Sequence, residues 1–299
     1  MYKKLIVPLD GSIKAEGVLP FVDDLTAKFN SEILLIGVSA VRTISMPRLL
    51  STYIESIADK IRTKGIQVQA HLLPGNPGEE IINFANNNRD GLLVMVNYGG
   101  SGTSHWLLGD LIGKITLRTV IPVLLIPEKR LSLDSFSSRF KRILVPLDTS
   151  PDGEAALPWA IELSKKAGSK IFLLHVLPSI YKTYGLPDYA VNFEKQLFET
   201  LRIEGEKYLK NVTDNIAKEN LETASYVTAG TPAERIFTYA EEHLIDLIAI
   251  STHGRTGIKR FVLGSVARQV IFSTDIPVLL IRAKREHIPA DTNIKSQKS

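Results

Sequence analysis

The chain has 299 residues, more than one hydrophobic core usually supports, so length alone predicts two domains of roughly 140 residues each. Its 36 Lys and Arg residues and 32 Asp and Glu residues give a net charge of +4, and they are interspersed along the chain. This pattern argues against nucleic acid or a membrane as a partner. The absence of cysteine excludes disulfides, thiolate catalysis and cysteine-ligated zinc, and it fits a cytoplasmic location.

A repeat begins with the first predicted strand, which ends at Asp10. The segment KKLIVPLDGS at 3–12 returns as KRILVPLDTS at 141–150, 138 residues later. Two further segments return 155 residues later: GNPGEEIINFA at 75–85 and IPVLLIP at 121–127. Because the second offset is 17 residues larger, the second copy carries an insertion between its second and third strands.

The repeat predicts the domain organisation of the chain. We expect a first domain, a charged and Ser-rich linker, a second domain, and a polar tail without fixed structure. Their boundaries are 1–127, 128–140, 141–283 and 284–299.

Short apolar runs alternate with stretches of helical period in each copy, which is typical of βα units and a parallel sheet. The strands expected in the second copy are 142–147, 170–176, 223–227, 247–251 and 278–281. The helices expected between them are 152–167, 193–218, 232–242 and 263–273. The predicted fold class is therefore α/β, with two tandem, five-stranded, doubly wound, Rossmann-like domains.

The segment STHGRTGIKRFVLGSV at 251–266 leaves the fourth strand through a Gly-rich turn and enters a helix. Backbone N–H groups at such a helix start lack intrahelical acceptors and attract anions. Gly254 and Gly264 would allow close approach of a phosphate, and Ser265 adds a hydroxyl donor. Arg255, together with Lys259 and Arg260, would offset the charge of a polyphosphate. The alternative is a tight turn with a helix cap, since no Walker motif is present.

The combination of VPLD and TS at 145–150, HV at 175–176, AGTPAE at 229–234 and the Gly-rich segment resembles universal stress proteins over nearly the whole chain, twice. The resemblance implies a strand order of 3-2-1-4-5. In one branch of that family it also implies ATP, with or without Mg²⁺, held by GxxGx9G(S/T).

Carried onto this sequence, the motif places its second glycine at Gly254 and ends in Gly264 and Ser265, whereas Ser251 replaces the first glycine. Asp148 would accept hydrogen bonds from the adenosine, and Val176 would flank the base. The nucleotide-binding residues implied are Pro146, Leu147, Asp148, Thr149, Val176, Ser251, Thr252, His253, Gly254, Arg255, Gly264, Ser265 and Val266.

The first copy differs at the same positions. Gly99 and Gly109 are kept, but Val96 stands at the first glycine and Asp110 replaces the Ser or Thr. A carboxylate near a phosphate adds like-charge repulsion. We expect weak or absent nucleotide binding there; the alternative is that Asp110 chelates a cation bridging to phosphate.

The remaining motifs give weaker evidence of function. The six histidines lack paired metal-ligand spacing, so no metal site is expected; His253 is the one that could touch the ligand. No nucleophile elbow is present, and Asp10 and Asp148 are explained by strand ends and ribose contact rather than by base catalysis. The insertion at 177–192 is expected to be a surface segment, with a ligand-covering lid as the alternative.

The repeated IPVLLI strands are apolar edges, and we expect the copies to join through them as an intramolecular pseudo-dimer, as the resemblance also suggests. The predicted function is an ATP-binding stress or regulatory protein without catalytic residues, acting on an unidentified protein partner. Pseudo-dimers associating further into a homodimer are left open. The alternatives are a nucleotide-free interaction module and a slow ATP hydrolase using Asp148 or His253.

Overall fold

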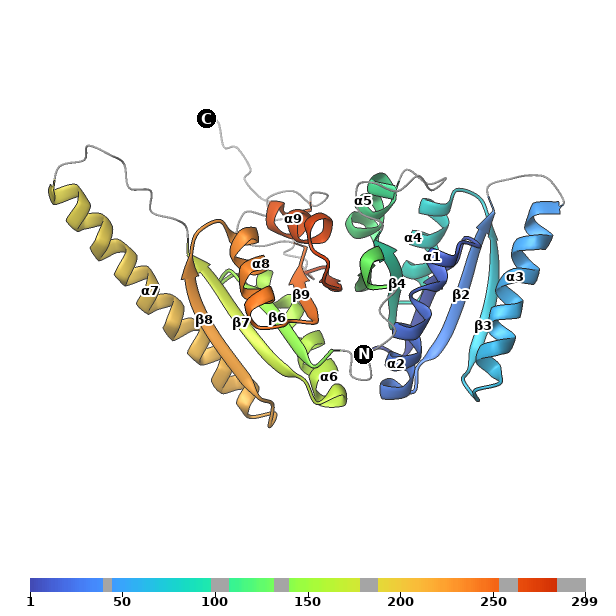
Figure 1. The fold of residues 1–299 in the computed structure, drawn as a ribbon, viewed down its shortest axis with the longest axis horizontal. Helices are drawn as coiled ribbons and strands as arrows, with labels where there is room; N and C mark the ends of the chain where they lie inside the picture. Colours follow the sequence, from blue (N-terminus) through green and yellow to red (C-terminus); the bar gives the residue numbers. More distant parts are fainter. Residues whose placement is uncertain (40–44, 98–107, 132–139, 178–187, 253–262, 284–299) are drawn as a thin grey trace, which may run out of the picture.

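A computed structural model describes residues 1–39, 45–97, 108–131, 140–177, 188–252 and 263–283 (Figure 1). The first copy contains β1 (Lys4–Pro8), α1 (Ile13–Glu16), α2 (Leu19–Phe29), β2 (Glu32–Ser39), α3 (Ser45–Arg62), β3 (Val68–Pro74), α4 (Pro77–Asn87), β4 (Gly91–Asn97), α5 (Leu108–Arg118) and β5 (Val123–Pro127), followed by the 3₁₀ turn η2 (Glu128–Arg130). The second contains β6 (Arg142–Leu147), the 3₁₀ turn η3 (Gly153–Ala156), α6 (Leu157–Ala167), β7 (Lys170–Leu177), α7 (Asp188–Ala217), β8 (Thr223–Ala229), α8 (Pro232–Glu242), β9 (Leu247–Ser251), α9 (Ser265–Ser273) and β10 (Val278–Ile281).

All ten strands form one sheet, in the order β3-β2-β1-β4-β5-β10-β9-β6-β7-β8. Within each copy the strands are parallel and follow 3-2-1-4-5, so the predicted fold class is confirmed. The two fifth strands meet in the middle and pair antiparallel, with Leu124 opposite Leu279. This pairing gives each apolar fifth strand a second neighbour and produces the intramolecular pseudo-dimer.

The sheet separates two hydrophobic cores, and each core runs through both copies. Helices α2, α3, α6 and α7 cover one face, while α4, α5, α8 and α9 cover the other. The central strands are buried on both faces, which explains why they read as continuous apolar runs rather than as alternating ones.

Each copy also contributes one aromatic side chain that packs against a helix of the other copy. Tyr2, before β1, packs edge-on against Trp159 of α6 with ring centroids 5.2 Å apart. Its hydroxyl donates to the Trp159 carbonyl oxygen at 2.8 Å. The repeat-equivalent pair, Phe140 and Phe21, lies 6.3 Å apart across the same junction. Phe140 falls in the segment expected to be a linker, yet its side chain is fully buried.

Element boundaries differ from the predictions in the second copy. The helix expected from residue 152 begins instead as η3 and becomes α-helical only at Leu157, where Pro158 occupies the first turn. The helix expected from residue 193 begins at Asp188, so part of the predicted insertion belongs to α7. At 30 residues α7 is longer than the 18 residues of α3, and its amino-terminal end extends beyond the sheet in Figure 1. The remaining insertion residues, 178–187, and the tail, 284–299, lie outside the described residues.

Candidate functional site

The turn after β6 carries four of the predicted site residues. Pro146 is half-buried, Leu147 is buried, and Asp148 and Thr149 are half-buried. The Asp148 carboxylate oxygen Oδ1 accepts from the Ser150 backbone N–H at 3.1 Å and from the Ser150 hydroxyl at 2.6 Å. The same hydroxyl accepts from the Gly153 N–H at 3.0 Å. These bonds fix the Asp148 side chain against the start of η3.

Gly153 is required by this close packing. A Cβ atom at this position would lie 2.3 Å from Asp148 Oδ1, well inside contact distance. Any other residue would therefore displace the carboxylate, which ties the glycine to the placement of Asp148.

The end of β9 and the start of α9 are joined by backbone hydrogen bonds. Ser251 and Thr252 are buried, and the Thr252 N–H donates to the Ile281 carbonyl at 2.8 Å. The Gly264 N–H donates to the Thr252 carbonyl at 2.9 Å, and a Cβ at Gly264 would approach that oxygen to 3.2 Å. The glycine therefore lets the amino end of α9 sit directly beside the end of β9.

The amino terminus of α9 has the features of an anion site. Gly264 is the N-cap and provides no side-chain acceptor, Ser265 is exposed, and the first turn carries no acidic residue. The N–H groups of residues 265–267 are those that helix geometry leaves without an intrahelical acceptor. Together with the positive end of the helix dipole, they favour a bound anion.

The sheet brings this helix start and the Asp148 turn together. β6 pairs with β9, Leu144 being opposite Ile248, so Asp148 and Ser251 end adjacent strands at the same edge. The strand order reverses between β6 and β9, and such switch points form the crevices in which doubly wound proteins bind ligands. Val176 of β7 is half-buried and packs against the core below α8 and α9. Val266 is half-buried beside Ser265, whereas His253, Gly254 and Arg255 lie outside the described residues.

One buried polar residue of this edge was not assigned a role by the sequence reasoning. His175 of β7 is 5% exposed, and its Nδ1 lies 2.7 Å from the Leu147 carbonyl oxygen. A comparison of the two copies could have drawn attention to His175, because the first copy has Gly37 at the equivalent position.

A titratable group with a shifted pKa lies at the opposite end of these strands. Asp246, before β9, accepts backbone N–H groups of Lys141 at 2.8 Å and Arg142 at 3.1 Å. Burial raises its pKa to about 6 from the usual 3.8, although both hydrogen bonds act in the other direction. Its place at the amino ends of β6 and β9 separates it from the Asp148 turn, so its role is structural.

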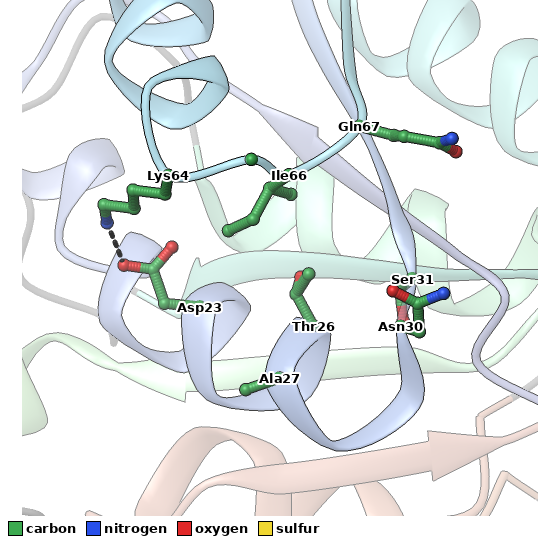
Figure 2. A pocket seen from close by; sticks show the side chains of 9 residues that line it. Asp23, Thr26, Ala27, Asn30, Ser31, Lys64, Ile66 and Gln67 are labelled. Atoms are coloured by element: carbon green, nitrogen blue, oxygen red, sulfur yellow. Dashed lines mark hydrogen bonds and ion pairs between the residues drawn. The ribbon is translucent and has the colours of Figure 1, made fainter.

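The structure also describes a polar cavity of about 410 Å³ in the first copy, between the end of α2 and the turn before β3 (Figure 2). Lys64 and Asp23 form an ion pair at 2.6 Å on its wall, and Thr26 and Gln67 also line it. The carboxyl ends of α2 and α3 lie there, where helix dipoles are negative and disfavour phosphate. This cavity is therefore a poor candidate for nucleotide.

None of the helices in the part of the chain that the structure describes combines the length and the apolar character of a membrane span. In the same part of the chain, no group of three or more His, Asp or Glu side chains could hold a metal ion.

The fold and the edge geometry define a class: a tandem, doubly wound α/β protein with an uncapped helix terminus at a strand switch point. The family model for the universal stress protein family matches residues 1–127 and again 139–282. The chain therefore belongs to the universal stress protein family, with two family domains in one polypeptide.

Relatives and solved structures agree with this assignment. The universal stress protein MJ0531 of Methanocaldococcus jannaschii is 31% identical over 147 residues, which are 49% of this chain and 85% of the relative. YxiE of Bacillus subtilis is 28% identical over 48% of this chain and 99% of its own length. The crystal structure of a universal stress protein from Archaeoglobus fulgidus has the same fold, with a TM-score of 0.70 at 23% identity, covering 94% of this chain and 96% of that one.

Proposed function

We propose that the chain is a cytoplasmic ATP-binding regulatory protein whose second copy holds the nucleotide with little or no turnover. The observation that carries the proposal is the amino terminus of α9. It has no capping side chain and no acidic residue in its first turn, and it begins beside the end of β9. A triphosphate is an anion that such a terminus favours.

The residues near this edge fit the nucleotide. Gly264 keeps side-chain atoms away from the Thr252 carbonyl, and Ser265 adds an exposed hydroxyl for a phosphate oxygen. Asp148, held by Ser150, would accept from the ribose hydroxyls, and Val176 would supply apolar contact for the base. Thr149, Ser251 and the segment from His253 to Arg255 complete the proposed site by their place in the sequence motif.

ATP supplies charge and shape for binding in this proposal, and the chain's own residues only bind and orient it. Mg²⁺ would enter as a counter-ion of the triphosphate, coordinated mainly by phosphate oxygens and water. Bound nucleotide would then favour one conformation of the pseudo-dimer and change its affinity for a protein partner or for a second pseudo-dimer.

The test is to purify the chain, denature it, and identify the released small molecules by chromatography. The proposal predicts about one ATP per chain, because α5, the helix equivalent to α9, carries Asp110 in its first turn, whereas the first turn of α9 has no acidic residue. Calorimetric titration of nucleotide-free protein with ATP should give the same stoichiometry. Multiple turnovers of ATP would favour the slow hydrolase, and an empty protein that gives no heat with ATP or ADP would refute the proposal.

A further inference from the structure

Each copy has an equivalent space between its second strand and the helix that follows it. A helix side chain fills this space in the first copy, and a strand side chain fills it in the second. In the first copy β2 has Gly37, where an added Cβ would lie 3.0 Å from Leu50 Cγ of α3. In the second copy the strand position is His175 and the helix position is Gly205, where an added Cβ would lie 2.8 Å from His175 Cδ2. A large residue on the helix has thus been exchanged for a large residue on the strand, which keeps the space filled.

The exchange gives the second copy a hydrogen bond at the edge of the site. His175 is opposite Leu147 in the β6–β7 register, and its Nδ1 lies 2.7 Å from the Leu147 carbonyl oxygen. A carbonyl oxygen only accepts hydrogen bonds, so Nδ1 carries the proton. Glycine at position 37 has no side chain with which to make this bond in the first copy.

The backbone that follows Leu147 needs such support only in the second copy. Thr149 has φ of +66°, a left-handed conformation that is unfavourable by about 1 to 2 kcal/mol for a residue with a Cβ. The equivalent residue of the first copy is Gly11, with φ of +87°, which adopts this region without that penalty. The strained turn and the histidine therefore occur in the same copy.

Two other contacts of the turns occur in both copies, so they do not explain the difference. Ser12 N–H donates to Asp10 Oδ1 at 3.0 Å, as Ser150 does to Asp148. Tyr53 donates to Glu16 at 2.9 Å, as Tyr208 donates to Glu154 at 2.7 Å. These repeated bonds form a common scaffold, to which the second copy adds His175.

We infer that His175 is a positioning residue for the nucleotide site: its Nδ1–H holds the Leu147 carbonyl, so that the strained turn presents Asp148 and Thr149 to the nucleoside. The inference rests on the proposed function and adds a second difference between the copies, remote from the phosphate-binding helix. It assigns nucleoside recognition to a residue that need not touch the ligand.

Two substitutions separate the hydrogen bond from the bulk of the ring. In His175→Asn the amide N–H₂ can occupy the place of Nδ1–H, whereas His175→Leu has similar size without a donor. We expect ATP affinity within about threefold of wild type for His175→Asn and about tenfold weaker for His175→Leu, the effect of losing one hydrogen bond. The double variant His175→Gly/Gly205→Leu, which copies the Gly37 and Leu50 pair, provides a filled core without a donor and should bind like His175→Leu.

A cycle with Thr149→Gly tests the role in positioning. Because glycine needs no support at positive φ, His175→Leu should weaken ATP binding by no more than about threefold in the Thr149→Gly background. A merely structural loss would be the same in both backgrounds. Nitrogen NMR of the nucleotide-free protein should show His175 protonated at Nδ1.

The outcomes distinguish this inference from the proposed function. A wild-type protein that binds no adenine nucleotide overturns the proposed function and this inference with it. If the wild type binds ATP while His175→Leu binds equally well, or the loss is the same with Thr149→Gly, the inference alone is overturned.

Discussion

The sharpest prediction exchanges one residue between the copies. Ser265, the first residue of α9, is replaced by aspartate, the residue at the equivalent position 110 of the first copy. Ser265 is exposed, so the substitution adds a carboxylate without disturbing the core. The change acts on binding and on stability in opposite directions, and this contrast makes it informative.

The expected magnitudes follow from electrostatics. A carboxylate and a phosphate about 5 Å apart repel by roughly 3 kcal/mol at an effective dielectric constant of about 20. This corresponds to a Kd for ATP about a hundredfold weaker. In the nucleotide-free protein the same carboxylate lies at the positive end of the α9 dipole and should stabilise the fold by about 0.3 to 1 kcal/mol.

Calorimetric titration with ATP and thermal unfolding without nucleotide measure the two effects. Ser265→Asn is the matched neutral control, because it has the shape of aspartate without its charge and should weaken binding by no more than about tenfold. The converse change in the first copy, Asp110→Ser, should leave ATP binding by the second copy unaltered. The reasoning is refuted if Ser265→Asp binds ATP as tightly as wild type, or if its loss of affinity comes with a lower melting temperature in the absence of nucleotide.

Three further predictions concern stability, each measured by urea unfolding followed by circular dichroism. Because burial raises the folded-state pKa of Asp246 from 3.8 to about 6, the favourable contribution of this group is complete below about pH 4 and is lost as pH rises through 6. The stability of wild type relative to Asp246→Asn should fall by about 2 kcal/mol between pH 4 and pH 7.5, and a pH-independent difference would contradict the assigned burial. Gly205→Leu should destabilise by about 1 to 3 kcal/mol through contact with His175, and adding His175→Gly should restore most of that; additive losses would argue against a shared space. Trp159→Ala removes the ring that packs edge-on against Tyr2 across the junction and should cost roughly 3 kcal/mol, lowering the stability of both copies together, whereas separate transitions would show that the junction does not couple them.

Much of the fold was predictable because the repeat and the apolar periodicity report local and buried structure directly. The strands at 142–147, 247–251 and 278–281 have the predicted bounds. The strand order came from the family resemblance, because periodicity alone does not specify which strands are neighbours. The predicted proximity of the Asp148 turn to the end of β9 holds because β6 and β9 pair.

What the sequence reasoning missed depends on contacts between distant residues. Phe140 was predicted to end a polar linker, because the local sequence does not reveal that Phe21 of the other copy packs against it. The bond from His175 requires the absent side chain of Gly205, 30 residues away and on a different element. The left-handed turn at Thr149 is hidden because threonine does not mark positive φ as glycine does.

The antiparallel pairing of β5 with β10 also affects how the two unlike halves assemble and evolve. If the halves were separate chains with the same apolar edge, each could pair with its own kind as well as with the other. Joining them in one polypeptide enforces a mixed pair in every molecule and makes its assembly independent of protein concentration. Either half can then diverge from the other, provided that its fifth strand still completes the sheet of its neighbour.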